Sequence, residues 1–158
     1  MAMKLDTLVP AVPEGHMPDA ARRYRTSDHS VEIVSDSGEV AQKCGQVFVS
    51  VSAKMGNGVW TVEIIPAEVE PPPRSIAGAS GIRIRLGDGP VTNWGDETDL
   101  VVAFNEQVLL GRHRLGSLID CAIVLLDEMW DTHPDESIRA HWEAALAELE
   151  GAGYEIVL

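Results

Sequence analysis

The stretch that decides the fold is VEIVSDSGEVAQKCGQVFVSVSAKMG, residues 31–56. A short strand pattern at 31–34 leads into the turn residues SDSG at 35–38, and apolar residues at helical spacing follow. A strand, a tight turn and a helix in this order open an α/β sheet. Because the first amides of a helix have no partner inside it, the same turn is a place where backbone N–H groups can face an anionic ligand.

The helix predicted after this turn runs to Met55. Its apolar residues recur at steps of three and four, which predicts that one face covers the sheet. The members of that face are Val40, Cys44, Val47, Phe48, Val51 and Met55. Ser37 is the candidate N-cap, and Gly56 follows as a stop signal. The segment at 47–52 also alternates with period two, so a strand is an alternative there, but the whole run fits the helical period better.

The rest of the chain repeats strand and crossover. Residues 59–65 form a near-continuous apolar run, which predicts an interior parallel strand buried on both faces. Further strands are predicted at 80–86, 100–104, 121–126 and 154–158. A helix is predicted after 126, with the side chain of Thr132 accepting an early amide and Asp135 complementing the helix dipole. Its apolar face consists of Ile138, Trp142, Ala145, Leu146 and Leu149.

Together these segments predict one α/β domain at 31–158, a three-layer sandwich with a mainly parallel sheet flanked by helices. Residues 1–30 contain three prolines and no apolar periodicity, so we expect an extended arm that a partner orders. Cys44 and Cys121 fall in apolar segments, which predicts buried reduced thiols.

The formal net charge of −13 argues against binding of nucleic acid or of an anionic membrane surface, because a polyanion is repelled. The start of the chain lacks the continuous apolar run of a signal peptide, and no stretch reaches the roughly 20 apolar residues of a membrane span. We therefore expect a cytoplasmic protein.

Candidate ligand or interface residues lie in the first turn, in the proline-rich loop and at strand ends. Arg83 and Arg85 share one side of the alternating strand and, with Arg74, can receive a phosphate, a carboxylate or an acidic partner; pairing with local acids is the alternative. Asn105 follows a strand, where it either meets a ligand or caps the next helix. The full candidate set is Ser35, Ser37, Gly38, Glu68, Arg74, Ser75, Arg83, Arg85 and Asn105.

No self-contained catalytic constellation is present in the sequence. The turn at 35–38 has one glycine where a dinucleotide fingerprint needs three, and no Gly-x-Ser-x-Gly elbow occurs. The acidic run from Asp127 to His133 suggests a metal site, but such runs more often begin a helix and face water. We predict no catalytic residue, no metal site and no bound cofactor on this chain.

The order of segments at 31–87, 96–110 and 121–128 resembles the gamma subunit or gamma domain of the 2-oxoacid:acceptor oxidoreductases. This thiamine-diphosphate and iron–sulfur family includes pyruvate and 2-oxoglutarate:ferredoxin oxidoreductases. The most telling parts are the turn before the long helix, the tract from IPAE at 65–68 to IRIR at 82–85, and DLVVAFN at 99–105.

The resemblance implies a noncatalytic part of a hetero-oligomeric enzyme that oxidatively decarboxylates a 2-oxoacid, usually to an acyl-coenzyme A, and passes electrons to ferredoxin or a similar acceptor. Thiamine diphosphate, magnesium and the iron–sulfur clusters are then expected on partner subunits, namely alpha- and beta-type catalytic subunits and an iron–sulfur subunit, with coenzyme A as a candidate substrate. Relatives carry more glycine in the first turn and continue beyond Leu158, so a naturally short and a truncated chain are both open.

Two rival hypotheses come from other classes of protein. One is a free-standing α/β binding module for a small anionic or nucleotide ligand at the carboxyl ends of the strands. The other is an assembly scaffold that kept the fold and lost ligand binding. The first predicts that the isolated chain binds its ligand, and the second predicts that Ser37 and Asn105 are dispensable for the complex.

Overall fold

A computed structural model describes residues 27–36, 39–65 and 79–158. Its elements are β1 (Asp28–Ser35), α1 (Glu39–Lys54), β2 (Gly58–Ile64), β3 (Ser80–Gly87), β4 (Thr98–Ala103), α2 (Glu106–Arg114), β5 (Leu118–Leu126), α3 (Glu136–Gly151) and β6 (Glu155–Val157). Within these ranges no helix has the length and apolar character that crossing a membrane requires.

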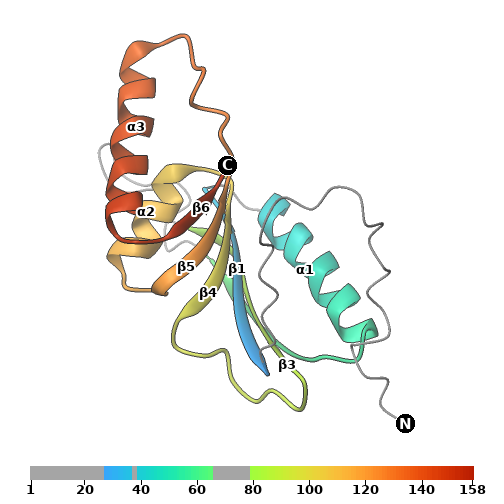
Figure 1. The fold of residues 1–158 in the computed structure, drawn as a ribbon. Helices are drawn as coiled ribbons and strands as arrows, with labels where there is room; N and C mark the ends of the chain where they lie inside the picture. Colours follow the sequence, from blue (N-terminus) through green and yellow to red (C-terminus); the bar gives the residue numbers. More distant parts are fainter. Residues whose placement is uncertain (1–26, 37–38, 66–78) are drawn as a thin grey trace, which may run out of the picture.

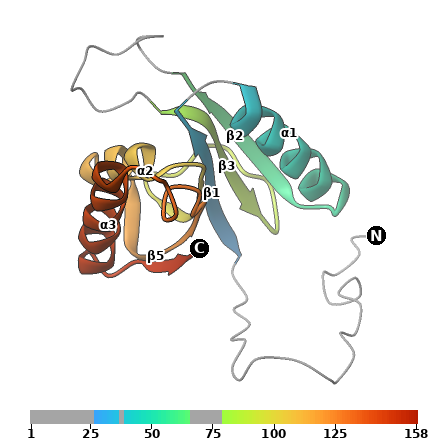
Figure 2. The same cartoon turned by 90° about the horizontal axis from the view of Figure 1, so that it is seen from above.

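The strands form one six-stranded sheet in the order β2-β3-β1-β4-β5-β6. β1, β4, β5 and β6 pair in parallel, whereas β3 runs antiparallel to both of its neighbours, β1 and β2. The sheet is therefore mainly parallel, with β3 as the reversed strand. α1 lies on one side of it, and α2 and α3 lie on the other (Figures 1 and 2). This arrangement confirms the predicted three-layer α/β sandwich.

The larger core lies between the sheet and the helices α2 and α3. Alternate residues of β4 and β5, among them Val101 and Val124, pack there with Leu109 of α2 and with Trp142 and Leu149 of α3. The predicted apolar face of the last helix is confirmed at Trp142, Ala145 and Leu149, which are all buried. The predicted cap at Thr132 is wrong, because the side chain of Asp135 accepts the hydrogen bond from the Ser137 amide.

The smaller core lies between α1 and the strands β1 and β3. It consists of Val31, Ile33, Ala41, Ile82 and Ile84, so the predicted alternation of β3 is confirmed. The helix itself is also confirmed, and the strand alternative at 47–52 is wrong. Small residues make the contact, because a Cβ added to Gly45 would lie 1.9 Å from Cγ2 of Ile82.

The predicted sheet-covering face of α1 is wrong. Ala41, Gly45 and Ser52 are the buried residues of the helix, while all six residues of the predicted face are exposed: Val40, Cys44, Val47, Phe48, Val51 and Met55. The helical spacing identified large apolar residues that share one side of the helix. The residues that face the sheet are the small ones beside them, because the helix backbone lies close to Ile82.

The strand predicted at 59–65 is also placed differently. β2 is an edge strand that pairs with β3 alone, and Trp60, Thr61 and Glu63 are exposed on it. Apolar composition suggested burial on both faces, whereas the antiparallel return of β3 takes the interior position beside β1. Both cysteines are free thiols, as expected, but they are exposed rather than buried.

Candidate functional site

The carboxyl ends of β4, β5 and β6 border a hollow of about 340 Å³. Its lining is apolar except for one carboxylate, and consists of Val102, Ala103, Phe104, Leu125, Leu126, Asp127, Val157 and Leu158. No cation lines it. Ligands of parallel sheets bind at this edge, but this hollow offers an apolar floor and an acid instead of groups that neutralise a phosphate.

Two polar residues follow β4 at the same edge. Asn105 caps α2, because its Oδ1 accepts a hydrogen bond from the Val108 amide at 2.9 Å. The alternative reading of Asn105 as a helix cap is thus confirmed. Glu106 is buried in the first turn of α2, and its Oε2 has no hydrogen-bond partner among the described residues. A carboxylate at this place is favoured by the positive end of the helix dipole.

The sheet face on the α1 side is covered over only half of its width. A row of paired residues crosses it through Ile33, Val102, Leu125 and Val157. Ile33 is 3% exposed, Val102 is half-buried, Leu125 is 39% exposed and Val157 is 45% exposed. The exposed fraction of the side chains therefore rises from β1 to β6, because α1 packs mainly on β1, β2 and β3.

A second row repeats the gradient one pair further along. It joins Val31, Leu100, Ile123 and Glu155, and it runs from fully buried at β1 to exposed at β6. We call the uncovered part of this face the open face, defined by Leu100, Val102, Phe104, Ile123, Leu125 and Val157. Side chains that alternate with these on β5, such as Val124, belong to the core under α2 and α3.

A further set of exposed apolar residues lies on α1, on the same side of the sheet as the open face. They form the α1 flank, defined by Val40, Cys44, Val47, Phe48 and Val51 with Met55 just after the helix, and the centre of this set lies about a quarter turn around the helix from the buried stripe. α1 connects β1 to β2, which runs in the same direction as β1, and it lies on one side of the sheet (Figures 1 and 2). In the right-handed connection that such units form, the flank is turned away from β2 and toward β4. The α1 flank and the open face therefore lie on the same side of the sheet.

A buried ion triad lies on the opposite side of the sheet. The Glu32 carboxylate is fully buried and accepts hydrogen bonds from Nε of Arg83 at 2.7 Å and from Nε of Arg112 at 2.8 Å. Arg83 also donates to the carbonyl oxygens of Gly95 and Asp96. The triad ties β1, β3, α2 and the loop after β3 together, and each guanidinium is neutralised in part by the shared carboxylate.

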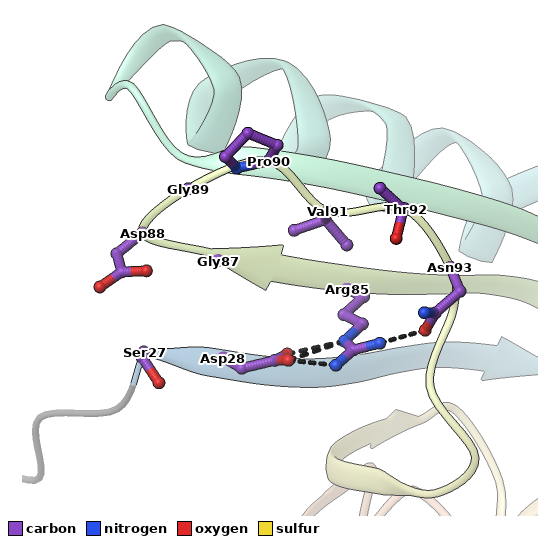
Figure 3. A pocket seen from close by; sticks show the side chains of 10 residues that line it. All are labelled: Ser27, Asp28, Arg85, Gly87, Asp88, Gly89, Pro90, Val91, Thr92 and Asn93. Atoms are coloured by element: carbon purple, nitrogen blue, oxygen red, sulfur yellow. Dashed lines mark hydrogen bonds and ion pairs between the residues drawn. The ribbon is translucent and has the colours of Figure 1, made fainter.

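Arg85 lines a separate pocket of about 280 Å³ beside the start of β1 (Figure 3). Its Nε donates to both Asp28 carboxylate oxygens at 2.8 and 2.9 Å, and its Nη1 donates to the amide oxygen of Asn93. The hydrogen bond from Arg85 holds the pKa of the Asp28 carboxyl below its usual range. The guanidinium thus points at protein acceptors on both sides rather than into open space.

The predicted site residues do not converge on one place. Ser35 is buried at the end of β1, and Asn105 lies at the start of α2, both at the carboxyl edge of the sheet. Arg83 and Arg85 belong to the two acid-paired clusters just described. Five further candidates lie outside the described residues: Ser37, Gly38, Glu68, Arg74 and Ser75.

The sequence interpretation missed Glu32 and Arg112, the partners of Arg83. One signal for Glu32 was present, since a charge in the middle of a buried strand rarely lacks a partner. The open face was missed as well, because its residues have the same composition as those of a covered face. The described residues contain no group of three or more His, Cys, Asp or Glu side chains arranged to hold a metal ion.

Comparison with known proteins identifies one curated relative in sequence, whereas no family model matches the chain. The relative is the 2-oxoglutarate oxidoreductase subunit KorA of Mycobacterium tuberculosis, which is 32% identical over 117 residues. The match covers 69% of this chain and 18% of KorA, so the chain spans about a fifth of the length of its relative.

Solved structures show the same fold at lower identity. The 2-oxoglutarate:ferredoxin oxidoreductase of Magnetococcus marinus matches 84% of this chain with 20% of its own, at a TM-score of 0.56 and 18% identity. The gamma subunit of a keto/oxoacid ferredoxin oxidoreductase from Geobacter sulfurreducens matches 70% of this chain with 57% of its own, at a TM-score of 0.50 and 15% identity. The fold is thus the one found in that gamma subunit, and the sequence match confirms the family inferred from the segment order: the chain belongs to the 2-oxoacid oxidoreductase family.

Proposed function

We propose that this chain is the gamma-type subunit of a cytoplasmic 2-oxoacid:acceptor oxidoreductase and that its role in the complex is structural rather than chemical. The observation that carries the proposal is the sequence match to KorA, which is 32% identical over 117 residues and covers 69% of this chain. The complex would decarboxylate a 2-oxoacid oxidatively, form an acyl-coenzyme A and pass the electrons to ferredoxin or a similar acceptor.

The distribution of charged groups supports a noncatalytic role. Arg83, Arg85, Arg112 and Arg114 each form an ion pair with a carboxylate of this chain. Glu106, which has an unpartnered oxygen, is buried under the start of α2 and has no base, nucleophile or metal ligand paired with it among the described residues. Chemistry that uses thiamine diphosphate, magnesium and iron–sulfur clusters is therefore assigned to the alpha- and beta-type subunits and the iron–sulfur subunit.

Coenzyme A fits the described part of this chain poorly. The phosphates of coenzyme A need cations or free helix amides, and the hollow at the carboxyl strand ends presents apolar side chains and the Asp127 carboxylate. The bound molecules described for the Magnetococcus enzyme include coenzyme A and succinyl-CoA, in a chain of which the present fold is a fifth. We assign coenzyme A to the complex as substrate and its phosphate contacts to the partners.

Affinity purification of the full chain from its native source tests the proposal. We expect thiamine-dependent and iron–sulfur polypeptides to co-purify in fixed ratio, and the preparation to reduce ferredoxin only when a 2-oxoacid and coenzyme A are both added. The chain purified alone is the control and should show no turnover. A native preparation that brings down neither class of polypeptide overturns the proposal. Calorimetric binding of coenzyme A or a nucleotide by the chain alone would favour the free-standing binding module instead.

A further inference from the structure

We propose that the surface formed by the open face and the α1 flank is a docking groove for an amphipathic helix of the catalytic polypeptide. This inference rests on the proposed function and adds to it the surface through which the chain joins the complex. The groove has a floor of half-buried and exposed aliphatic side chains on β4, β5 and β6, and a wall of exposed apolar side chains on α1.

The width of the floor fits one helix. Three strands at about 4.8 Å spacing place β4 and β6 roughly 10 Å apart, which is close to the diameter of a helix with its side chains. α1 packs mainly on β3, which lies two strand spacings, or about 10 Å, from β4. Helices that pack side by side keep their axes about 8–10 Å apart, so a helix that rests on β4 and the adjacent side of β5 would contact the α1 flank as well as the floor. Such a helix would complete the outer layer of a sandwich in which α1 covers only β1, β2 and β3.

The surface carries exposed apolar side chains on both of its parts. Val40, Val47 and Val51 on the wall are each more than half exposed, and Leu125 and Val157 on the floor are exposed by 39% and 45%. Scattered apolar residues are normal on protein surfaces, but these gather on α1, β5 and β6, on one side of the sheet. An occupant removes apolar area from water on both sides at once, which is the main source of stabilisation in such contacts.

The acidic residues around the groove favour a partner with basic side chains over a second copy of this chain. Glu155 lies in the floor row beside Ile123, and Asp127 lines the hollow at the end of β5. The chain as a whole carries a net charge of −13. A second copy would bring its own acids against these, and the repulsion opposes self-association. A helix with one apolar face and lysine or arginine beside it complements both the floor and its acids.

The lengths of the relatives favour the catalytic polypeptide as the source of that helix. The matched region is 18% of KorA and 20% of the Magnetococcus chain, so in both relatives a domain of this type belongs to a chain about five times as long. A domain that is one part of so large a chain must pack against the remainder, and an unfinished helical layer is the feature of this domain best suited to that contact.

The test measures affinity of the full chain for the remaining subunits of the reconstituted complex, by biolayer interferometry. The double variant Val47→Gln, Val51→Gln changes the wall at positions that a helix tolerates, and Leu125→Gln changes the floor independently. We expect each to weaken binding about a hundredfold, because several apolar contacts are lost at the centre of the interface. Leu115→Gln is the matched control: Leu115 is 74% exposed at the end of α2, on the other side of the sheet, and its replacement should leave binding unchanged.

Glu155→Lys adds a test of charge and should weaken binding about tenfold, with a smaller effect at high salt. Thermal unfolding of each variant confirms that it is folded before binding is compared. If the wild-type chain binds the other subunits and both groove variants bind equally well, the groove proposal is overturned while the proposed function stands. If the wild-type chain does not bind at all, the proposed function fails. A stable wild-type dimer that Leu125→Gln dissociates identifies a second copy as the occupant and also overturns the proposal.

Discussion

The two faces of the sheet bury the same kinds of side chain to very different extents. On the α2/α3 face, Val101, Val124 and Leu149 are shielded from solvent, and only the edge residues of the cluster are part-exposed. On the α1 face, residues of the same strands such as Ile123 and Leu125 remain more than a third exposed. Alternation along a strand supplies apolar side chains to both faces equally, so the difference comes entirely from which helix lies above them.

This contrast indicates that the two faces have different tasks. The α2/α3 face holds the domain together through a closed core. The α1 face is closed where small residues of α1 let the helix approach β1 and β3, and the remainder is part of the docking surface that we propose. Apolar patterning therefore marks a surface to be covered, without indicating whether the cover comes from the same domain.

One substitution on each face should give the largest difference in stability. Leu149→Ala should cost about 4 kcal/mol of unfolding free energy, because a fully buried leucine leaves a cavity in the closed core. Leu125→Ala should cost about 1 kcal/mol or less, because its side chain is already in contact with water. Urea unfolding of the isolated chain, followed by circular dichroism, measures both. Equal costs would show that the two faces are buried alike.

The second expected effect concerns the triad that closes the β3 end of the α2/α3 face. Glu32→Gln should cost about 3 kcal/mol, because it leaves two arginines packed against a neutral amide in a buried site. The matched control is Glu63→Gln on the exposed strand β2, which should change the unfolding free energy by less than about 0.5 kcal/mol. A Glu32→Gln variant as stable as the wild type would mean that the triad is dispensable for folding.

The third effect concerns the contact between Gly45 of α1 and Ile82 of β3. Gly45→Ala should destabilise the chain by about 2 kcal/mol, although alanine favours a helix, because the new Cβ would lie 1.9 Å from Cγ2 of Ile82. In an Ile82→Ala background the same change should be neutral or stabilising by up to about 1 kcal/mol. Calorimetric unfolding of the four chains gives the coupling directly. Additive costs would place the contact elsewhere on the helix.

The smallest effect is the pH dependence of the pair at the start of β1. Arg85 lowers the pKa of Asp28, so its contribution is fully present above the ordinary value of 3.8 and is lost as the pH falls through the lower folded pKa. Since the Asp28 side chain is 44% exposed, Asp28→Asn should cost only about 0.5 kcal/mol at pH 7. The difference from the wild type should vanish near pH 2, as acid unfolding curves would show. A difference that persists there would exclude the carboxylate as its cause.

Much of the fold follows from local sequence pattern. The helical spacing at 40–55 predicted a helix rather than a strand, and α1 is a helix. The alternation of Ile82 and Arg83 predicted that they lie on opposite sides of β3, and Ile82 is in the smaller core while Arg83 pairs with Glu32 on the other side. Capping by Asn105 was one of the two roles that its position after a strand predicted. These features depend on neighbours within a few residues, and such neighbours are fixed by helix and strand geometry.

The errors share one physical origin. The position of β2 at the sheet edge, the exposure of the α1 flank and the pairing of Arg83 with Glu32 all depend on residues far apart in the chain. Apolar composition gives 59–65 and 121–126 the same expected burial, although one forms an edge strand and the other lines both a core and an open face. Only the strand order decides between them.

The amino-acid sequence alone determined the succession of strands and helices, the α/β class and the family resemblance, since each depends on local periodicity or on the order of segments. The tertiary structure decided which apolar stripe is buried. The sequence marks the wide apolar side of α1, but the depth at which α1 lies is set by the contact of Gly45 with Ile82, and the coverage of β4 to β6 is set by the width of one helix. Burial is a property of what lies opposite a side chain, and that neighbour comes from elsewhere in the chain or from a partner.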